Sequence, residues 1–262
     1  MAMEELNLHS HSTTVDKAIR VVSFLPEHPE GVGVNALCRE LDVRKPGLLR
    51  ILNALTDAGW ILKDPETLRY RLGYHLLTLG AQALFGPHFQ EIAHQALGRL
   101  SVDADETANL GVLDHFRVVF IDQMEASHSI RLQVRVGSQA PSHCTGLGKV
   151  LLAHLDEKAL NTFLKEAPFE SFTSHTRVTA VALADELARV RRQGYAIDDE
   201  EHREGIRCIS APIYNYSGDA VAALSISGPI TRISDEALPT LVGHVTKNAS
   251  QVSDLLGYRV AQ

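Results

Sequence analysis

Four polar residues in the C-terminal part of the chain lie in or beside apolar runs: Asp198, Cys208, Ser225 and Ser227. An unpaired polar group buried in a strand costs about 1 to 3 kcal/mol, so each of these side chains needs a partner. Ser225 and Ser227 are two residues apart and share one face of a strand. A carboxylate, a thiol and two hydroxyls on one surface could line a pocket for a small polar molecule. The alternative is that they are strand-end residues bonded to their own backbone.

The stretch 194–229 has to position these side chains, and its pattern predicts a sheet. Three short apolar runs, at 195–197, 206–213 and 220–226, alternate with Gly, Asn and Asp, which favour tight turns. Two or three neighbouring strands are the expected result.

A second candidate site lies at 141–155, PSHCTGLGKVLLAHL, where a loop leads directly into a predicted amphipathic helix. Glycines at 146 and 148 allow close approach to the backbone, and free N–H groups at a helix N-terminus bind anions. The motif is not a dinucleotide fingerprint, because Leu151 occupies the place of the third glycine, and it is not a P-loop.

The rest of the C-terminal part mixes helices and strands. Periodicity predicts helices at 88–102, 157–165, 180–192 and 234–256, and strands at 107–113, 117–123 and 130–136. This order predicts an α+β sheet domain.

The composition limits the function classes. The chain has 262 residues and a net charge of −7, which argues against coating nucleic acid through bulk electrostatics. Three widely spaced cysteines, Cys38, Cys144 and Cys208, argue against a disulfide framework or a four-cysteine zinc site. No stretch is long and apolar enough for a membrane span, and no signal peptide is recognisable, so we expect a soluble, cytoplasmic protein without a membrane partner.

The N-terminal part predicts three helices followed by a hairpin. The first helix is marked by residues with helical spacing: Val15, Ala18, Ile19, Val22 and Leu25. A short helix at 34–41 and a third helix from Pro46 to Gly59 follow, separated by a tight turn. Alternating runs at 60–63 and 68–72 then predict a hairpin. This order is typical of a winged helix-turn-helix.

The charge distribution favours DNA contact by this module. Residues 13–73 contain nine Lys and Arg and eight Asp and Glu, so the acidity of the chain lies elsewhere. Arg44, Lys45 and Arg50 belong to the start and the exposed face of the third helix, and Arg69 and Arg71 alternate on the wing. They could contact phosphates and the major groove, or they could be ordinary solvated surface charges.

The segment 72–85, LGYHLLTLGAQALF, predicts a helix that leaves the wing. It is too apolar for a free linker, so we expect it to pack against a partner subunit or the next domain. The predicted organisation is a flexible arm at 1–12, a winged helix-turn-helix domain at 13–73, a linker helix at 74–86 and an effector-binding domain at 87–262.

The winged module, the linker helix and the motifs HCTGLGKVLLAHL, GYAIDDEEHREGIRCISAPI and AALSISGPITRIS resemble the IclR family of bacterial transcriptional regulators over about 13–258. The resemblance implies a GAF-like α/β effector domain, dimers or dimers of dimers on palindromic operator DNA, and no cofactor. It implies a small-acid site at Gly146, Leu147, Asp198, Cys208, Ser225 and Ser227. The candidate DNA-binding residues are Arg44, Lys45, Pro46, Gly47, Leu49, Arg50, Asn53, Arg69 and Arg71.

Departures from the family pattern limit what the resemblance implies. The family's third helix usually opens with Ser-Thr, and a polar or aromatic residue precedes its arginine. Here Pro46, Gly47 and Leu49 occupy those positions, so fewer side chains can reach base edges, although Arg50 matches the usual arginine. Leu147 stands where smaller residues also occur, which affects the size of the pocket.

The resulting hypothesis is a DNA-binding regulator, not an enzyme, whose affinity for its operator is changed by a small hydroxy-, oxo- or aromatic acid. One alternative is a cysteine-dependent enzyme that pairs Cys144 or Cys208 with His143 or His202. The other is a metal sensor that uses the run Asp198 to His202, although no metal ligand is assigned.

Overall fold

The computed structural model describes residues 14–83, 87–129 and 131–259. Its contacts divide the chain into two compact units, Met1–Pro87 and His88–Gln262, which are described separately below. The arm predicted at 1–12 lies outside the described residues. Among the described helices, none is both long enough and apolar enough to cross a membrane.

The first unit has the predicted order of helices and hairpin. Its elements are α1 (Thr14–Phe24), the 3-10 helix η1 (Leu25–Glu27), β1 (Val32–Gly33), α2 (Val34–Leu41), α3 (Lys45–Asp57), β2 (Ile61–Lys63), β3 (Arg69–Leu72) and α4 (His75–Ala83). Pro46 lies in the first turn of α3, where its missing N–H costs nothing. The short strand β1 was not predicted, and it pairs with β3 in a sheet of order β1-β3-β2.

The core of the first unit lies between α1, α2, α3 and the sheet, and includes Leu37, Leu48 and Leu52 with exposed fractions of 0%. The prediction for α1 was partly wrong. Val21 is buried, whereas Val15 and Ile19 are 67% and 53% exposed. The residues that contact the core are spaced three and four apart from Val21. Val15 and Ile19, six and two residues before Val21, point away from that stripe.

The second unit contains a six-stranded antiparallel sheet of order β6-β5-β4-β9-β8-β7. Its strands are β4 (Thr107–Asp114), β5 (Arg117–Met124), β6 (Gln139–Pro141), β7 (Ala196–Asp199), β8 (Ile206–Tyr214) and β9 (Ala220–Pro229). Its helices are α5 (Pro87–Ala104), α6 (Gly146–Ala153), α7 (Glu157–Glu166), α8 (Ala180–Gln193) and α9 (Leu238–Leu255). The predicted α+β architecture is confirmed.

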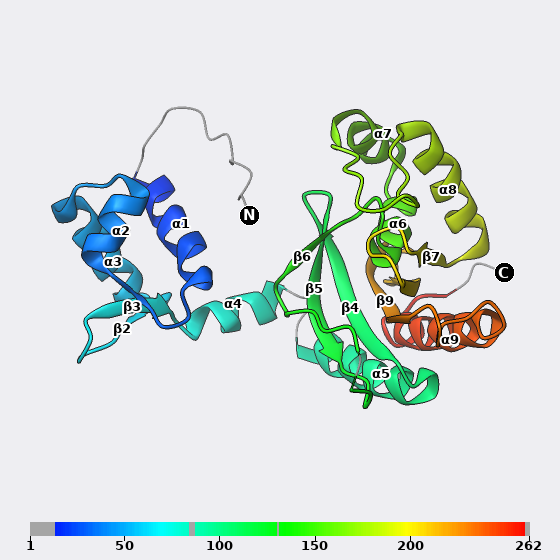
Figure 1. Cartoon of the computed structure of the whole chain (residues 1–262). Helices are drawn as coiled ribbons and strands as arrows, with labels where there is room; N and C mark the ends of the chain where they lie inside the picture. The colour runs from blue at the N-terminus through cyan, green and yellow to red at the C-terminus, as the bar shows by residue number, and fades with distance from the viewer. Residues whose placement is uncertain (1–13, 84–86, 130, 260–262) are drawn as a thin grey trace. The chain divides into compact units, whose positions relative to one another are not determined.

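Helices cover both faces of this sheet (Figure 1). On one face α5 and α9 enclose a core that includes Leu97, Leu224 and Val245. On the other face α6, α7 and α8 enclose a second core that includes Val150, Leu187 and Phe163. Residues that alternate along β8 and β9 therefore contribute to opposite cores, and Cys208, Ser210, Ser225 and Ser227 share the α6 side.

Two predictions for this unit were wrong. The described part of the strand predicted at 130–136 is irregular, because Arg131 and Gln133 donate to Glu125 and Gly137 bonds to Phe120 instead of continuing a strand. The helix α6 is not amphipathic, since all of its residues are buried between the sheet and α8.

Candidate functional site

A pocket of about 430 Å³ opens in the second unit, on the side of the sheet that carries α6. All six residues of the predicted small-acid site line it: Gly146, Leu147, Asp198, Cys208, Ser225 and Ser227. The walls are completed by residues of the segment 131–140 and of the loop between β7 and β8. The structure thus brings together residues that are up to 81 positions apart in the sequence.

Strand register explains how the polar side chains come together. Asp198 pairs with Cys208, and Cys208 pairs with Ser227, so the three residues form one row across β7, β8 and β9. Ser210 pairs with Ser225 in the neighbouring row. Directly paired residues project to the same face of a sheet, and both rows therefore face α6.

The N-terminus of α6 lines the pocket beside these strands. Thr145 is its N-cap, and its Oγ1 accepts from the N–H of Gly148 at 3.3 Å. The preceding N–H groups, those of Gly146 and Leu147, have no acceptor within the helix. Free N–H groups and the helix dipole together attract an anion.

Close packing requires glycine at the start of α6. A Cβ added to Gly146 would lie 2.5 Å from Ser210 Oγ, and a Cβ added to Gly148 would lie 2.2 Å from the carbonyl oxygen of Ser142. A side chain at Gly146 would separate the helix N-terminus from the polar rows of the sheet, and one at Gly148 would collide with the backbone of the preceding loop.

Ser210 is a pocket residue that the sequence analysis missed. Its side chain has an exposed fraction of 0%, and its Oγ has no hydrogen-bond partner among the described residues. A buried hydroxyl without a partner costs about 1 to 3 kcal/mol, so the pocket favours an occupant that bonds to it. The only available signal was the two-residue spacing from Cys208 in the same strand.

Asn109 on β4 is a second missed residue. It is buried, and its amide nitrogen lies 3.2 Å from Ser227 Oγ and 3.5 Å from Ser225 Oγ. The amide holds both hydroxyls from behind the pocket wall. It pairs with Ser225 in the sheet from a strand more than a hundred residues earlier, which sequence spacing cannot reveal.

Asp198 lies at the inner end of the pocket and is 2% exposed. Its Oδ1 accepts from the N–H groups of Glu201 at 2.9 Å and His202 at 3.2 Å. Burial raises the pKa of Asp198 to about 7, and the charge of Glu201 adds to this rise, while Lys149 opposes it. At neutral pH this carboxyl can therefore either donate or accept a hydrogen bond.

A buried network of charged residues supports the loop behind Asp198. Lys149 of α6 is fully buried and donates to Glu201, to Glu186 of α8 and to the carbonyl oxygen of Ile197. Arg177 completes the network, with nitrogen–oxygen distances of 2.6 Å to Glu201 and 3.3 Å to Glu186. Charged partners in a dry site stabilise each other only as a complete set.

The cysteine-enzyme alternative has little support in the geometry. Burial raises the pKa of both the Cys144 and the Cys208 thiols, so neither forms a thiolate readily. Burial also lowers the pKa of His143, whose Nε2 contacts the carbonyl oxygen of Glu170 at 2.9 Å. Burial lowers the pKa of His202 to about 4, which leaves its ring neutral at pH 7.

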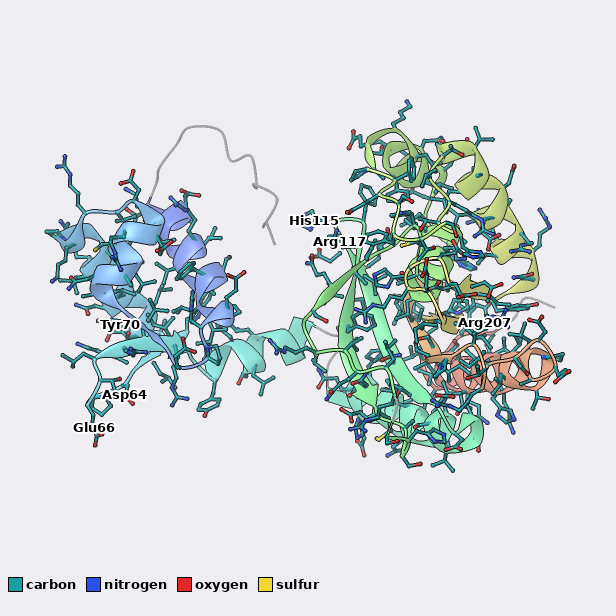
Figure 2. All side chains as sticks on the ribbon, in the orientation of Figure 1. Asp64, Glu66, Tyr70, His115, Arg117 and Arg207 are labelled. Atoms are coloured by element: carbon teal, nitrogen blue, oxygen red, sulfur yellow. The ribbon has the colours of Figure 1, made fainter. Side chains whose placement is uncertain are left out.

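The residues of the metal-sensor alternative have separate partners. Asp199 accepts from Arg207, which also donates to Asp235, and Figure 2 marks the position of Arg207. Glu200 accepts from the N–H of Gly205, and Glu201 binds Lys149. Among the described residues, no group of three or more His, Cys, Asp and Glu side chains could hold a metal ion.

The candidate DNA surface lies on the first unit. Most of its predicted residues are exposed: Arg44, Lys45, Pro46, Arg50, Asn53, Arg69 and Arg71. Gly47 and Leu49 are half-buried, because they lie beside the face of α3 that contacts the core. Lys45 donates to Asn35 of α2 at 3.1 Å, and Arg69 donates to the carbonyl oxygen of Gly31 at 3.4 Å.

A groove of about 440 Å³ beside α3 collects further positive charge. Lys17 of α1, which the sequence analysis missed, lines it together with Arg44 and Arg50. The turn between β2 and β3 is negatively charged instead, since it carries Asp64 and Glu66 (Figure 2). Hydrogen bonds from Thr67 lower the pKa of Asp64, so this turn stays negative at neutral pH.

Comparison with known families matches both units. The model of the bacterial transcriptional regulator IclR C-terminal domain matches residues 81–254, and that of the IclR helix-turn-helix domain matches residues 14–65. The chain belongs to the IclR family. It is therefore a DNA-binding transcriptional regulator of that family, as the resemblance implied.

Curated IclR relatives match nearly the whole chain. The HTH-type transcriptional regulator KdgR of Dickeya chrysanthemi is 32% identical over 98% of this chain and 85% of its own length. The acetate operon repressor of Salmonella typhimurium is 30% identical over 92% of this chain and 88% of its own length.

Solved IclR structures share the fold. The Thermotoga maritima IclR crystal structure is 30% identical, with a TM-score of 0.76, and the match covers 95% of this chain and all of that one. A homologue from Microbacterium hydrocarbonoxydans complexed with 4-hydroxybenzoate is 21% identical, with a TM-score of 0.82 over 93% of this chain and 99% of that one. At that identity the likeness shows the fold alone.

Proposed function

We propose that this IclR-family protein changes its affinity for operator DNA when a small hydroxy-, oxo- or aromatic acid binds in the pocket of the second unit. The observation that supports this most strongly is the pocket itself, in which an unpartnered buried hydroxyl, Ser210, lies beside the free N–H groups at the start of α6. The protein would act in the cytoplasm as a dimer or a dimer of dimers on a palindromic operator, and would need no cofactor.

In the proposed complex the effector carboxylate accepts from the N–H groups of Gly146 and Leu147 and from the hydroxyls of Ser225 and Ser227. Asp198 faces the hydroxyl or hydrated carbonyl of the acid. Cys208 forms part of the pocket wall and is only weakly polar. A bare carboxylate next to an ionised Asp198 would be repelled. The raised pKa of Asp198 supports this placement, because a neutral carboxyl can donate to the effector instead.

Operator binding is proposed to use Arg50 and Asn53 on the exposed face of α3, with Arg44 and Lys45 at its start. Lys17 adds a phosphate contact from the groove beside α3. Contact by the wing would use Arg69 and Arg71 on β3, because the acidic turn of Asp64 and Glu66 would be repelled by phosphates.

The helix α4 is the proposed element for communication between subunits or domains. Tyr74, which immediately precedes α4, is 72% exposed, and Leu77 within α4 is 74% exposed. These exposed apolar side chains support contact with a partner chain. A hundredfold change in operator affinity requires the effector to favour one arrangement by about 2.7 kcal/mol.

The test is thermal stability of the full chain against a panel of hydroxy-, oxo- and aromatic acids. A ligand present at a hundred times its dissociation constant stabilises the native state by about 2.7 kcal/mol, which raises the Tm. Aromatic acids are included because the homologue from Microbacterium hydrocarbonoxydans was crystallised with 4-hydroxybenzoate. We expect at least one acid to raise the Tm of the wild type, and Ser225→Ala to reduce the shift.

Operator binding is measured in parallel on DNA selected by the protein from a random pool. The acid that raises the Tm should change affinity for this DNA in the wild type and not in Ser225→Ala. DNA binding with no thermal response to any acid would contradict the proposed effector class.

A further inference from the structure

We propose that the effector carries a second anionic group, a carboxylate or a phosphate, which Arg135 and Arg203 bind at the outer end of the pocket. This inference rests on the proposed function, since it assumes that an acid occupies the inner end.

Both arginines line the pocket, and both are exposed, which places them at its solvent side. They come from opposite edges of the sheet. Arg135 belongs to the irregular segment that leads into the edge strand β6, and Arg203 belongs to the loop after the edge strand β7. The pocket is where these two edge segments converge.

The two guanidinium groups are not committed to ion pairs. Three more deeply placed arginines of this unit are paired with carboxylates: Arg177 with Glu201, Arg207 with Asp199 and Arg232 with Glu106. Within the described ranges, neither Arg135 nor Arg203 has a salt bridge or a side-chain hydrogen bond. Their charges therefore remain available to a ligand.

The pocket is divided by charge along its length. Its inner end holds Asp198 with the hydroxyls and the start of α6, and accommodates one carboxylate. A second anion beside Asp198 would be opposed, whereas beside Arg135 and Arg203 it would be attracted. His202 contributes no positive charge at neutral pH, so these arginines are the two fixed cations among the lining residues.

The size of the cavity agrees with a ligand that reaches both ends. About 430 Å³ lies in the range of about 300 to 1,000 Å³ typical of small-molecule sites. An acid of two or three carbons would occupy only the inner end. A molecule that bonds to both ends would connect the β6 and β7 edges of the sheet, and Arg203 shares its loop with the Glu201 and His202 N–H groups that hold Asp198.

The experiment compares matched acids that differ only in the second anionic group. The pairs are lactate and malate, 2-oxobutyrate and 2-oxoglutarate, and glycerate and 3-phosphoglycerate, titrated calorimetrically into the full chain at constant ionic strength. We expect at least one dianion to bind about tenfold more tightly than its monoacid, a difference that one charge-assisted contact can supply. The pair that shows the difference distinguishes a carboxylate from a phosphate.

The variants Arg135→Gln and Arg203→Gln should each remove most of that difference and leave monoacid affinity within about twofold. Arg192→Gln removes an exposed arginine of α8 that does not line the pocket, and it should change neither affinity. Ser225→Ala should weaken both members of each pair.

Equal affinities for monoacid and dianion, or equal losses for both in Arg135→Gln and Arg203→Gln, would overturn the outer subsite and leave the proposed effector function intact. If none of these six acids binds but an aromatic acid raises the Tm of the full chain, the outer subsite alone falls. If no acid of any class raises the Tm, the outer subsite and the proposed effector function both fall.

Discussion

Arg50 and Asn53 in the first unit are exposed on a single helix, whereas Asp198 and Ser225 in the second unit are buried on different strands. The residues of α3 that are proposed to contact DNA are neighbours in the sequence, and their backbone is held by a core that they do not enter. The pocket residues contribute to the polar interior of the sheet, so each one affects both the fold and the proposed site.

This difference predicts two kinds of mutational response. Substitutions on the DNA surface should change binding and leave stability almost unaltered, because exposed side chains contribute little to folding. Substitutions around the pocket should change both, because buried polar groups depend on their partners. The following experiments test that separation, from the largest expected effect to the smallest.

Lys149→Met should produce the largest loss of stability. The substitution leaves Glu186 and Glu201 buried with only Arg177 and Arg189 as partners. Breaking a buried ion pair costs about 3 to 5 kcal/mol. Urea unfolding followed by circular dichroism should show a lower midpoint for the second unit. Trp60, the only tryptophan, reports on the first unit by fluorescence, and its transition should not move.

Arg189→Gln is the control for this experiment, because it removes an exposed partner of the same Glu186 and should cost less than about 1 kcal/mol. A loss in Lys149→Met no larger than in Arg189→Gln would contradict the view that the pocket depends on the network.

Arg50→Ala should show the opposite behaviour. Loss of one base or phosphate contact weakens operator binding by about 1 to 3 kcal/mol. The free energy of unfolding should change by less than about 0.5 kcal/mol, because the side chain is exposed. Affinity for the selected DNA and urea unfolding are measured on the same preparation. Asp57→Ala, an exposed change at the far end of α3, is the control, and a loss of stability in Arg50→Ala would weaken the comparison.

The same difference explains which features the sequence could predict. Residues 34–72 carry local signals, such as Pro46 in the first turn of α3 and alternation at Arg69 and Arg71, and the structure has these elements where they were predicted. Asp198, Ser225 and Ser227 were found because polar residues stand out in apolar strands.

Ser210 in the pocket, and Lys149 and Asn109 behind it, give no such local signal. Lys149 reads as the polar face of an amphipathic helix, and only the packing of α8 against α6 reveals that it is buried with Glu186. Asn109 and Ser210 depend on strand order and register. The strand predicted at 130–136 failed because its side chains bond to Glu125, a contact that alternation does not encode.

The pH dependence of Asp198 sharpens the comparison, because no group on the DNA surface is buried in this way. The folded-state pKa of about 7 lies above the ordinary value of 3.8, so the folded protein binds more protons than the unfolded chain between these values. Stability contributed by this group is therefore lost as the pH rises from about 4 to 7. Asp198→Asn should abolish the part of this loss of stability that comes from Asp198. The free energy of unfolding is measured in urea between about pH 4 and pH 7.

The affinity for the effector should depend on the protonation of Asp198 as well. If a neutral Asp198 donates to the bound acid, affinity should fall by up to about tenfold per pH unit above pH 7. Asp198→Asn should flatten this slope, and operator binding without effector should not share it. An identical slope in Asp198→Asn would assign the pH dependence to another group.

Thr145→Ala should have the smallest effect, and it should affect both the stability of the second unit and the binding of the acid. Thr145 caps α6, and Thr179 caps α8 by the same contact with the N–H three residues later. Loss of either cap should cost about 1 kcal/mol of stability. Only Thr145→Ala should also weaken binding of the acid that raises the Tm, because only the start of α6 faces the pocket. Equal weakening in Thr179→Ala would mean that affinity follows the stability of the whole unit, and the start of α6 would then have no specific part in binding the anion.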